Sequence, residues 1–250
     1  MKKIVIANWK MNPASAKEAE RILRDIDPAG VKKTTVVVCP PAVYLGGLKK
    51  FSRKIFLGGQ NVASEPAGPY TGEISAEMLS SLGAKYVIVG HSERRELGET
   101  NEEVNKKIKA ALAAGLSPIV CVGEKERQAD HAYIQTVRQE LLECLRGVSK
   151  NLISKIIVAY EPIWAVSSTV SRRDATAADS YEMAIFIRKI ISDISQAAGQ
   201  KIKIIYGGSV NERNAGEFLA RGGVDGVLVG KASLDAKKFA EIIKLAEVVK

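Results

Sequence analysis

The stretch that decides the fold is YVIVGHSERRELGETNEEVNKKIKAALAAGLSPIVCVGE, residues 86–124. It opens and closes with short runs rich in valine and isoleucine that do not alternate with polar residues. Such runs are typical of parallel strands buried on both faces. Between them, TNEEVNKKIKAALAAG has a helix pattern that stops at a glycine, Gly115. The stretch therefore predicts a strand–helix–strand unit with a right-handed crossover.

The same unit recurs along the whole chain. Eight strands that alternate with helices predict an α/β fold with a parallel sheet. The simplest arrangement is a closed, single-domain (β/α)₈ barrel over residues 1–250, because no linker rich in proline, glycine or serine divides the chain. The pattern alone leaves an open doubly wound sheet as the alternative, and in both folds the functional residues follow the strands. The other six strand runs are KIVIA near residue 4, TTVVVC near 35, KIFLG near 55, KIIVAY near 156, KIIYGG near 204 and GVLVG near 226.

Composition excludes several classes of protein. The content of 46% hydrophobic and 26% charged residues is ordinary for a soluble globular protein. Three scattered cysteines and two histidines do not make a disulfide framework or a metal cluster, so we expect no metal site. The amino-terminal sequence lacks the apolar core of a signal peptide, and no apolar run approaches the about 18 residues of a membrane span. We expect a cytoplasmic protein that does not bind membranes.

The formal net charge of +9 raises the hypothesis of a nucleic-acid partner. The basic residues are spread along the chain and are mostly interleaved with acidic ones, which is typical of solvated helix faces. We therefore expect no nucleic-acid partner. A positive field would still speed the arrival of an anionic substrate.

Polar and ionisable residues stand where the predicted strands stop. Asn8 and Lys10 follow the first strand, His91 the fourth and Glu161 the sixth. A carboxylate next to water-excluding apolar residues suits a general base that removes a proton beside a carbonyl group. An imidazole at the start of a helical turn is kept neutral and can stabilise the enediolate oxygen, while a lysine neutralises substrate charge. Glycine-rich turns after later strands offer backbone N–H groups for a phosphate.

Eight segments give the chain a specific resemblance. In their order and spacing they resemble the triosephosphate isomerases over essentially the whole length. The resemblance implies a (β/α)₈ barrel that interconverts dihydroxyacetone phosphate and D-glyceraldehyde 3-phosphate, in glycolysis and gluconeogenesis, without a metal or organic cofactor. The segments are ANWKMN (7–12), GGQNVA (58–63), YTGEIS (70–75), GHSERR (90–95), VCVGE (120–124), AYEPIWA (159–165), YGGSV (206–210) and DGVLVG (225–230).

The resemblance also implies a role for each residue of the site. Glu161 is similar to the base that moves the proton between two carbons, and His91 to the electrophile that serves the two oxygens. Lys10 resembles the cation that binds substrate, Asn8 a hydrogen-bonding neighbour, and Glu93 a buried carboxylate paired with that lysine. The phosphate-binding and lid-latching positions match Ser167, Tyr206, Gly207, Gly208, Ser209, Gly230 and Lys231. Cys121 matches a structural cysteine, which we interpret as packing and not as a nucleophile.

Residues 60–75 resemble the long third loop by which subunits of this family pair. The resemblance implies a homodimer in which Thr71 reaches toward the partner's active site. The alternative is an ordinary surface turn rich in proline and glycine.

The chain departs from the family pattern at three places. The lid over residues 165–175 lacks glycine and is longer than usual, so we expect Ser167 to offer the phosphate its backbone N–H, and Arg172 or Arg173 to replace the usual hinge lysine. Lys231 stands where the family has a second glycine. Leu97 and Gly98 shorten a loop near His91. Two alternatives remain open: another phosphate-binding barrel with a different substrate, and a non-catalytic basic protein on the same fold.

Overall fold

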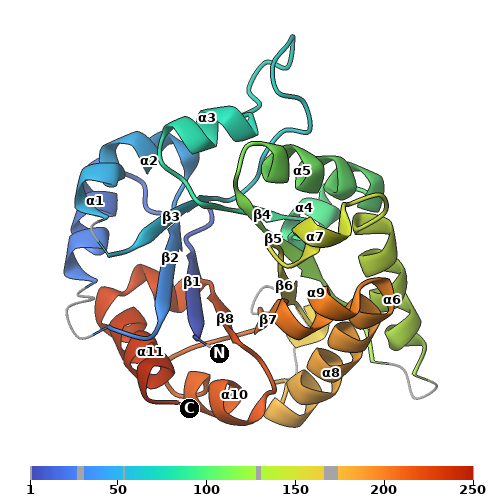
Figure 1. The fold of residues 1–250 in the computed structure, drawn as a ribbon. Coiled ribbons are helices and arrows are strands. Elements are labelled where there is room, and N and C mark those ends of the chain that lie inside the picture. The colour runs from blue at the N-terminus through green and yellow to red at the C-terminus, as the bar shows by residue number, and fades with distance from the viewer. Residues whose placement is uncertain (1, 27–30, 53, 128–130, 166–173, 250) are drawn as a thin grey trace.

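In a computed structural model, the protein is described at residues 2–26, 31–52, 54–127, 131–165 and 174–249. Eight parallel strands close into a barrel in chain order, with β8 paired to β1. A ring of helices surrounds the strands (Figure 1). The prediction of a closed (β/α)₈ barrel is confirmed, and each of the eight apolar runs forms a strand. The strands are β1 (Ile4–Asn8), β2 (Thr35–Cys39), β3 (Phe56–Gly59), β4 (Tyr86–Val89), β5 (Ser117–Val122), β6 (Ile157–Tyr160), β7 (Lys203–Tyr206) and β8 (Gly226–Val229).

Several helices begin at capping residues that the sequence places before them. Ser15 caps α1, and Thr100 and Thr176 form capping boxes at α5 and α8, which supply partners to otherwise unpaired backbone N–H groups. The helices are α1 (Ala16–Asp25), α2 (Ala42–Leu48), α3 (Ala76–Ser81), α4 (Ser92–Glu96), α5 (Asn101–Ala113), α6 (Ala132–Cys144), α7 (Lys150–Ile153), α8 (Ala177–Ile194), α9 (Gln196–Lys201), α10 (Ala215–Arg221) and α11 (Ala236–Val248), with 3₁₀ turns η1 (Lys49–Phe51), η2 (Ile163–Ala165) and η3 (Lys231–Leu234).

One helix prediction is wrong in detail. The pattern DSYEMAIFIRKIISDISQAAG predicts a single helix that ends at its last glycine, Gly199. The structure instead ends α8 at Ile194. The next residue, Ser195, has an extended backbone, and its hydroxyl accepts the N–H of Ala198 at the start of α9. Gly199 lies inside α9. A Cβ at this position would stand 2.0 Å from Ser192 Oγ, so only glycine fits there. Close packing of the two helices, and not a helix stop, accounts for this glycine.

The apolar core has two layers, which position the ends of the strands. One layer lies between the sheet and the helices, and the other fills the barrel interior. The strands are therefore buried on both faces, as their sequences predict. The interior layer consists of Ile4, Ile6, Val37, Cys39, Ile88, Ile119, Cys121, Ile157, Ala159, Ile205 and Leu228.

Candidate active site

The predicted polar residues meet at the carboxyl ends of the strands. Asn8 ends β1, His91 follows β4 and Glu161 follows β6, so a closed barrel brings together residues that are far apart in the chain. With Lys10 they line a cavity of about 900 Å³ that extends over the turns after β7 and β8. This volume is ample for a small phosphorylated substrate.

Glu161 is held on one side and unpaired on the other. Its side chain is 2% exposed, and its Oε2 atom accepts the backbone N–H of Ser92 at 3.0 Å. The Oε1 atom has no hydrogen-bond partner among the described residues and lies 3.4 Å from Nε2 of His91. An unpaired buried carboxylate oxygen is costly unless something binds to it, so this atom is placed to take up a proton.

The imidazole of His91 faces Glu161 in a defined tautomer. His91 caps α4, and its Nδ1 atom accepts the backbone N–H of Glu93 at 3.2 Å. An Nδ1 atom that accepts a hydrogen bond leaves the ring proton to Nε2, the nitrogen that faces Glu161. The prediction that His91 starts a helical turn is confirmed.

Lys10 is held in position by its backbone as much as by its side chain. Its φ of 53° lies in the left-handed region, which is uncommon for a residue with a Cβ. The Lys10 N–H donates to Oδ1 of Asn8 at 3.0 Å, and the Gln60 amide donates to the carbonyl of Lys10 at 2.8 Å. These two bonds stabilise the strained backbone at the edge of the cavity.

Glu93 pairs with Lys10 but is not buried in the single chain. The distance from Nζ to Oε1 is 2.5 Å, while the Glu93 side chain is 41% exposed. The resemblance implies a buried Glu93, whereas in the single chain its side chain is partly exposed. The neighbouring Met11 is 95% exposed, which is unusual for a large apolar side chain.

The turns after β7 and β8 form the other side of the cavity. Gly207, Gly208, Ser209, Gly230 and Lys231 all line it. A Cβ on Gly208 would lie 2.2 Å from the hydroxyl of Tyr206, and one on Gly207 would lie 2.9 Å from Cγ of Glu161. The backbone can approach so closely only without side chains. Lys231 is exposed, and the lid residues Ser167, Arg172 and Arg173 lie outside the described residues.

Comparison with known proteins supplies the family. Residues 3–246 match the family model described as triosephosphate isomerase. The chain belongs to the triosephosphate isomerase family. It is 44% identical to the triosephosphate isomerase of Dictyoglomus thermophilum, with 97% of this chain and 99% of that protein covered. It is 43% identical to that of Dehalococcoides mccartyi strain BAV1, with 100% and 98% covered.

A solved triosephosphate isomerase structure, from Bartonella henselae, gives the same result. It is 35% identical, has a TM-score of 0.85, and the match covers 98% of this chain and 99% of that one. The present member of the triosephosphate isomerase family interconverts dihydroxyacetone phosphate and glyceraldehyde 3-phosphate, a step of glycolysis.

Two supporting residues of this triosephosphate isomerase site were missed by the sequence reasoning. The Glu99 side chain is 4% exposed, accepts the N–H of Gly90 at 3.0 Å and pairs with the ammonium group of Lys107. Arg95 donates to the Gly90 carbonyl at 2.8 Å. The backbone N–H and the carbonyl of Gly90, the residue before His91, are thus both held by charged side chains. The signal was present in SERRELGE, where charged residues recur in a segment that must pack against the barrel.

A third missed residue, Glu124, supports the segment after Glu161. One of its oxygens accepts from the Tyr160 hydroxyl and from the Trp164 indole N–H, both at 2.8 Å. Glu124 is 1% exposed and also lies 3.5 Å from Arg127. These bonds fix the residues on both sides of Glu161, which sequence spacing does not reveal because β5 and β6 are far apart in the chain.

Cys121 packs in the barrel interior. Burial raises the pKa of its thiol well above the ordinary value, and the nearby carboxylate of Glu161 raises this pKa further. The thiol therefore stays protonated, which agrees with its interpretation as a packing residue. Within the described residues, no three histidine, cysteine or carboxylate side chains are placed to hold a metal ion. No described helix is both long enough and apolar enough to cross a bilayer.

Proposed function

We propose that Glu161 is the catalytic base, His91 the electrophile and Lys10 the substrate-binding cation of this isomerase. The observation that supports this most directly is the unpaired, buried Oε1 of Glu161, 3.4 Å from Nε2 of His91, in one cavity with Lys10. A glutamate base with a neutral histidine electrophile is the assignment established for triosephosphate isomerases in general, and it is carried over to this chain.

The geometry supports a simple order of proton transfers. Oε1 of Glu161 removes a proton from the carbon beside the carbonyl group, and Nε2–H of His91 donates to the carbonyl oxygen, which gives an enediolate stabilised by the ammonium of Lys10. His91 then gives its Nε2 proton to the former carbonyl oxygen and takes the proton of the neighbouring hydroxyl. Return of the carbon proton from Glu161 to the former carbonyl carbon completes the isomerisation. Asn8 orients the backbone of Lys10, and Glu93 orients its side chain.

The phosphate belongs, in this proposal, at the turns after β7 and β8. Gly208, Ser209 and Gly230 offer backbone N–H groups that no bulky side chain screens, whereas the predicted donor Gly207 already gives its N–H to the carbonyl of Tyr160 at 2.7 Å. Lys231 adds positive charge at the rim, and Ser167 remains a prediction. No metal or cofactor enters the proposed steps.

Steady-state turnover of glyceraldehyde 3-phosphate, with and without a phosphoglycolate-type inhibitor, tests the assignment. We expect rapid turnover and inhibition much tighter than substrate binding, because an enediolate mimic captures transition-state stabilisation. Turnover without tight inhibition would contradict the proposed position of the phosphate. Absence of turnover, with tight binding of a different sugar phosphate, would favour the alternative of another phosphate-binding barrel.

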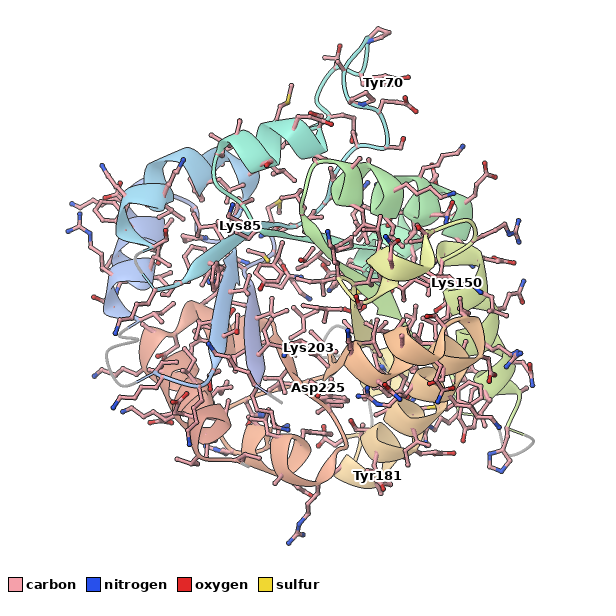
Figure 2. The ribbon with its side chains drawn as sticks, viewed as in Figure 1. Tyr70, Lys85, Lys150, Tyr181, Lys203 and Asp225 are labelled. Atoms are coloured by element: carbon pink, nitrogen blue, oxygen red, sulfur yellow. The ribbon has the colours of Figure 1, made fainter. Side chains whose placement is uncertain are left out.

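We further propose that the active form is a homodimer formed by residues 60–75. This segment projects from the body of the barrel, with Tyr70 on it (Figures 1 and 2). Large apolar side chains are exposed both beside Lys10 and on this segment, with Met11 at 95% and Tyr70 at 49%. A partner that covers them would also bury Glu93, and Thr71 would then reach the partner's site. That residues 1–250 form one domain, and that the enzyme is cytoplasmic, remain predictions.

A further inference from the structure

Six of the eight strands have a lysine within the two residues before them. Because all strands of a closed parallel barrel start at the same end, these lysines share one surface, here called the amino-end face. It is opposite the catalytic cavity. The residues are Lys2 and Lys3 before β1, Lys32 and Lys33 before β2, Lys54 before β3, Lys85 before β4, Lys155 before β6, and Lys201 before β7, whose first residue is Lys203.

The lysines of the amino-end face outnumber the carboxylates beside them. One such carboxylate is Glu247 of α11, whose oxygens accept the backbone N–H groups of Lys32, Lys33 and Thr34 at 2.7–2.8 Å. In the described part of the four residues before each strand, the one acidic residue is Asp225, which is 8% exposed. Its carboxylate already accepts from Arg188 at 3.1 Å and from the N–H of Ile204 at 2.9 Å. Within the described chain no carboxylate forms an ion pair with the exposed lysines of this face, which are Lys2, Lys32, Lys33, Lys54, Lys85, Lys155 and Lys201.

An aromatic pair lies within this basic surface. Phe56 is the first residue of β3 and is 46% exposed, and its ring meets that of Tyr86, the first residue of β4, edge to face at 6.0 Å. Lys54 and Lys85 flank the pair in sequence. Lys85 and Lys203 both lie close to the ring of strands, inside the circle of helices (Figure 2). An exposed ring among unpaired ammonium groups combines a stacking surface with phosphate-binding charge.

We propose that the amino-end face binds single-stranded nucleic acid. The lysines take the phosphates, and the Phe56 ring takes an unpaired base. Stacking favours a single strand over a duplex, because only an unpaired base exposes its flat face. The expectation of no nucleic-acid partner depended on the scatter of basic residues along the chain. The closed barrel brings a subset of them together at one end, so lysines that are far apart in the sequence share one surface in the folded protein.

The test measures binding of a fluorescent oligouridine of about 20 nucleotides to the full-length protein by anisotropy, between about 50 and 200 mM salt. One variant carries Lys54→Gln, Lys85→Gln and Lys155→Gln. Its matched control carries Lys17→Gln, Lys189→Gln and Lys244→Gln, which lie exposed on α1, α8 and α11. Both variants lower the formal net charge from +9 to +6 by removing three lysines.

We expect the first variant to lose about tenfold or more in affinity and to flatten the salt dependence by about two units, since each phosphate contact of a single strand contributes about 0.7. The control variant should change affinity by less than about threefold. Equal losses in the two variants would overturn the proposal in favour of general electrostatic attraction. Absence of binding at about 150 mM salt would also overturn it.

A second variant separates base stacking from charge. Phe56→Leu keeps the charge and an apolar side chain but removes the ring. We expect a loss of about fivefold or more toward oligouridine and unchanged binding of inorganic polyphosphate, which has no bases. Equal effects on both ligands, or none on oligouridine, would contradict the proposal, as would preferential binding to phosphatidylserine vesicles. Isomerase turnover, which occurs at the opposite end, shows that each variant is folded.

Discussion

Glu161 is positioned by neighbours that leave one of its two oxygens free for chemistry. The Ser92 N–H occupies Oε2, and the peptide on each side of Glu161 is fixed through Glu124. Proton transfer requires close approach of the reacting atoms, so the length of this side chain matters as much as its charge.

We expect Glu161→Asp to lower kcat by about 10²–10⁴-fold with little change in stability, because the shorter side chain withdraws the carboxylate by about one methylene. Steady-state kinetics and thermal unfolding measure the two effects. Turnover similar to that of the unchanged enzyme would refute the role of Glu161 as base.

Gly208 is a second position where a small change has a large expected effect. In Gly208→Ala the new Cβ meets the Tyr206 hydroxyl at 2.2 Å, so the turn after β7 must move. Overpacking of this kind costs about 1–3 kcal/mol, and we expect it to raise KM by about tenfold. The control is Gly47→Ala on α2, where a Cβ meets nothing within 4 Å. A KM that changes equally in both variants would exclude Gly208 from the phosphate site.

At this scale the sequence predicted the polar residues that meet in the cavity and missed the residues that support them. Asn8, Lys10, His91 and Glu161 could be predicted because each lies at or within two residues of the end of an apolar run. Gln60, Glu99 and Glu124 hold the site through contacts between segments far apart in the chain, and no local pattern marks such contacts.

Among the elements, α11 contacts the start of β2 through one carboxylate. Glu247 accepts the backbone N–H groups of Lys32, Lys33 and Thr34 at 2.7–2.8 Å. Burial acts to raise the pKa of Glu247, but these donors prevail and lower the pKa to about 2. The ionised form is therefore favoured in the folded protein.

We expect Glu247→Gln to destabilise the protein by about 1 kcal/mol at neutral pH, because the amide is a weaker acceptor and places its NH₂ beside a donor. Since the folded pKa is depressed, this contribution is complete above the ordinary value of 4.5 and is lost as the pH falls toward about 2. Chemical denaturation across this pH range measures it, with Glu241→Gln on the same helix as the control. A difference between Glu247→Gln and the unchanged protein that stayed constant down to pH about 2 would contradict the assignment.

Most elements could be predicted from the sequence, since valine- and isoleucine-rich runs, capping residues and glycine stops are local signals. The break between α8 and α9 could not. Ser195 and Gly199 adopt their roles because two helices pack closely, and that packing is a tertiary effect.

In the whole molecule, the two ends of the barrel carry different surfaces. The cavity lies at the carboxyl ends of the strands, and the lysines of the amino-end face lie at the opposite ends. A third surface includes the exposed side chains of Met11 and Tyr70, and the proposed dimer would cover it.

We expect light scattering to give about twice the chain mass of 27.0 kDa at micromolar concentration. Met11→Glu should dissociate the dimer and lower activity, because it places a charge on the rim that the partner covers. Val248→Glu, at a side chain that is 75% exposed on α11, is the control and should leave the mass unchanged. A Met11→Glu variant that keeps twice the chain mass would place the contact elsewhere.

The three free cysteines are all buried, and they occupy different layers. Cys39 and Cys121 lie in the barrel interior, while Cys144 lies between the sheet and the helices. Burial raises the pKa of each thiol, so a thiol reagent reaches sulfur only when the surrounding structure opens. The native chain thus carries built-in reporters of unfolding: site-resolved labelling rates would reveal whether the helical shell loosens before the strands separate.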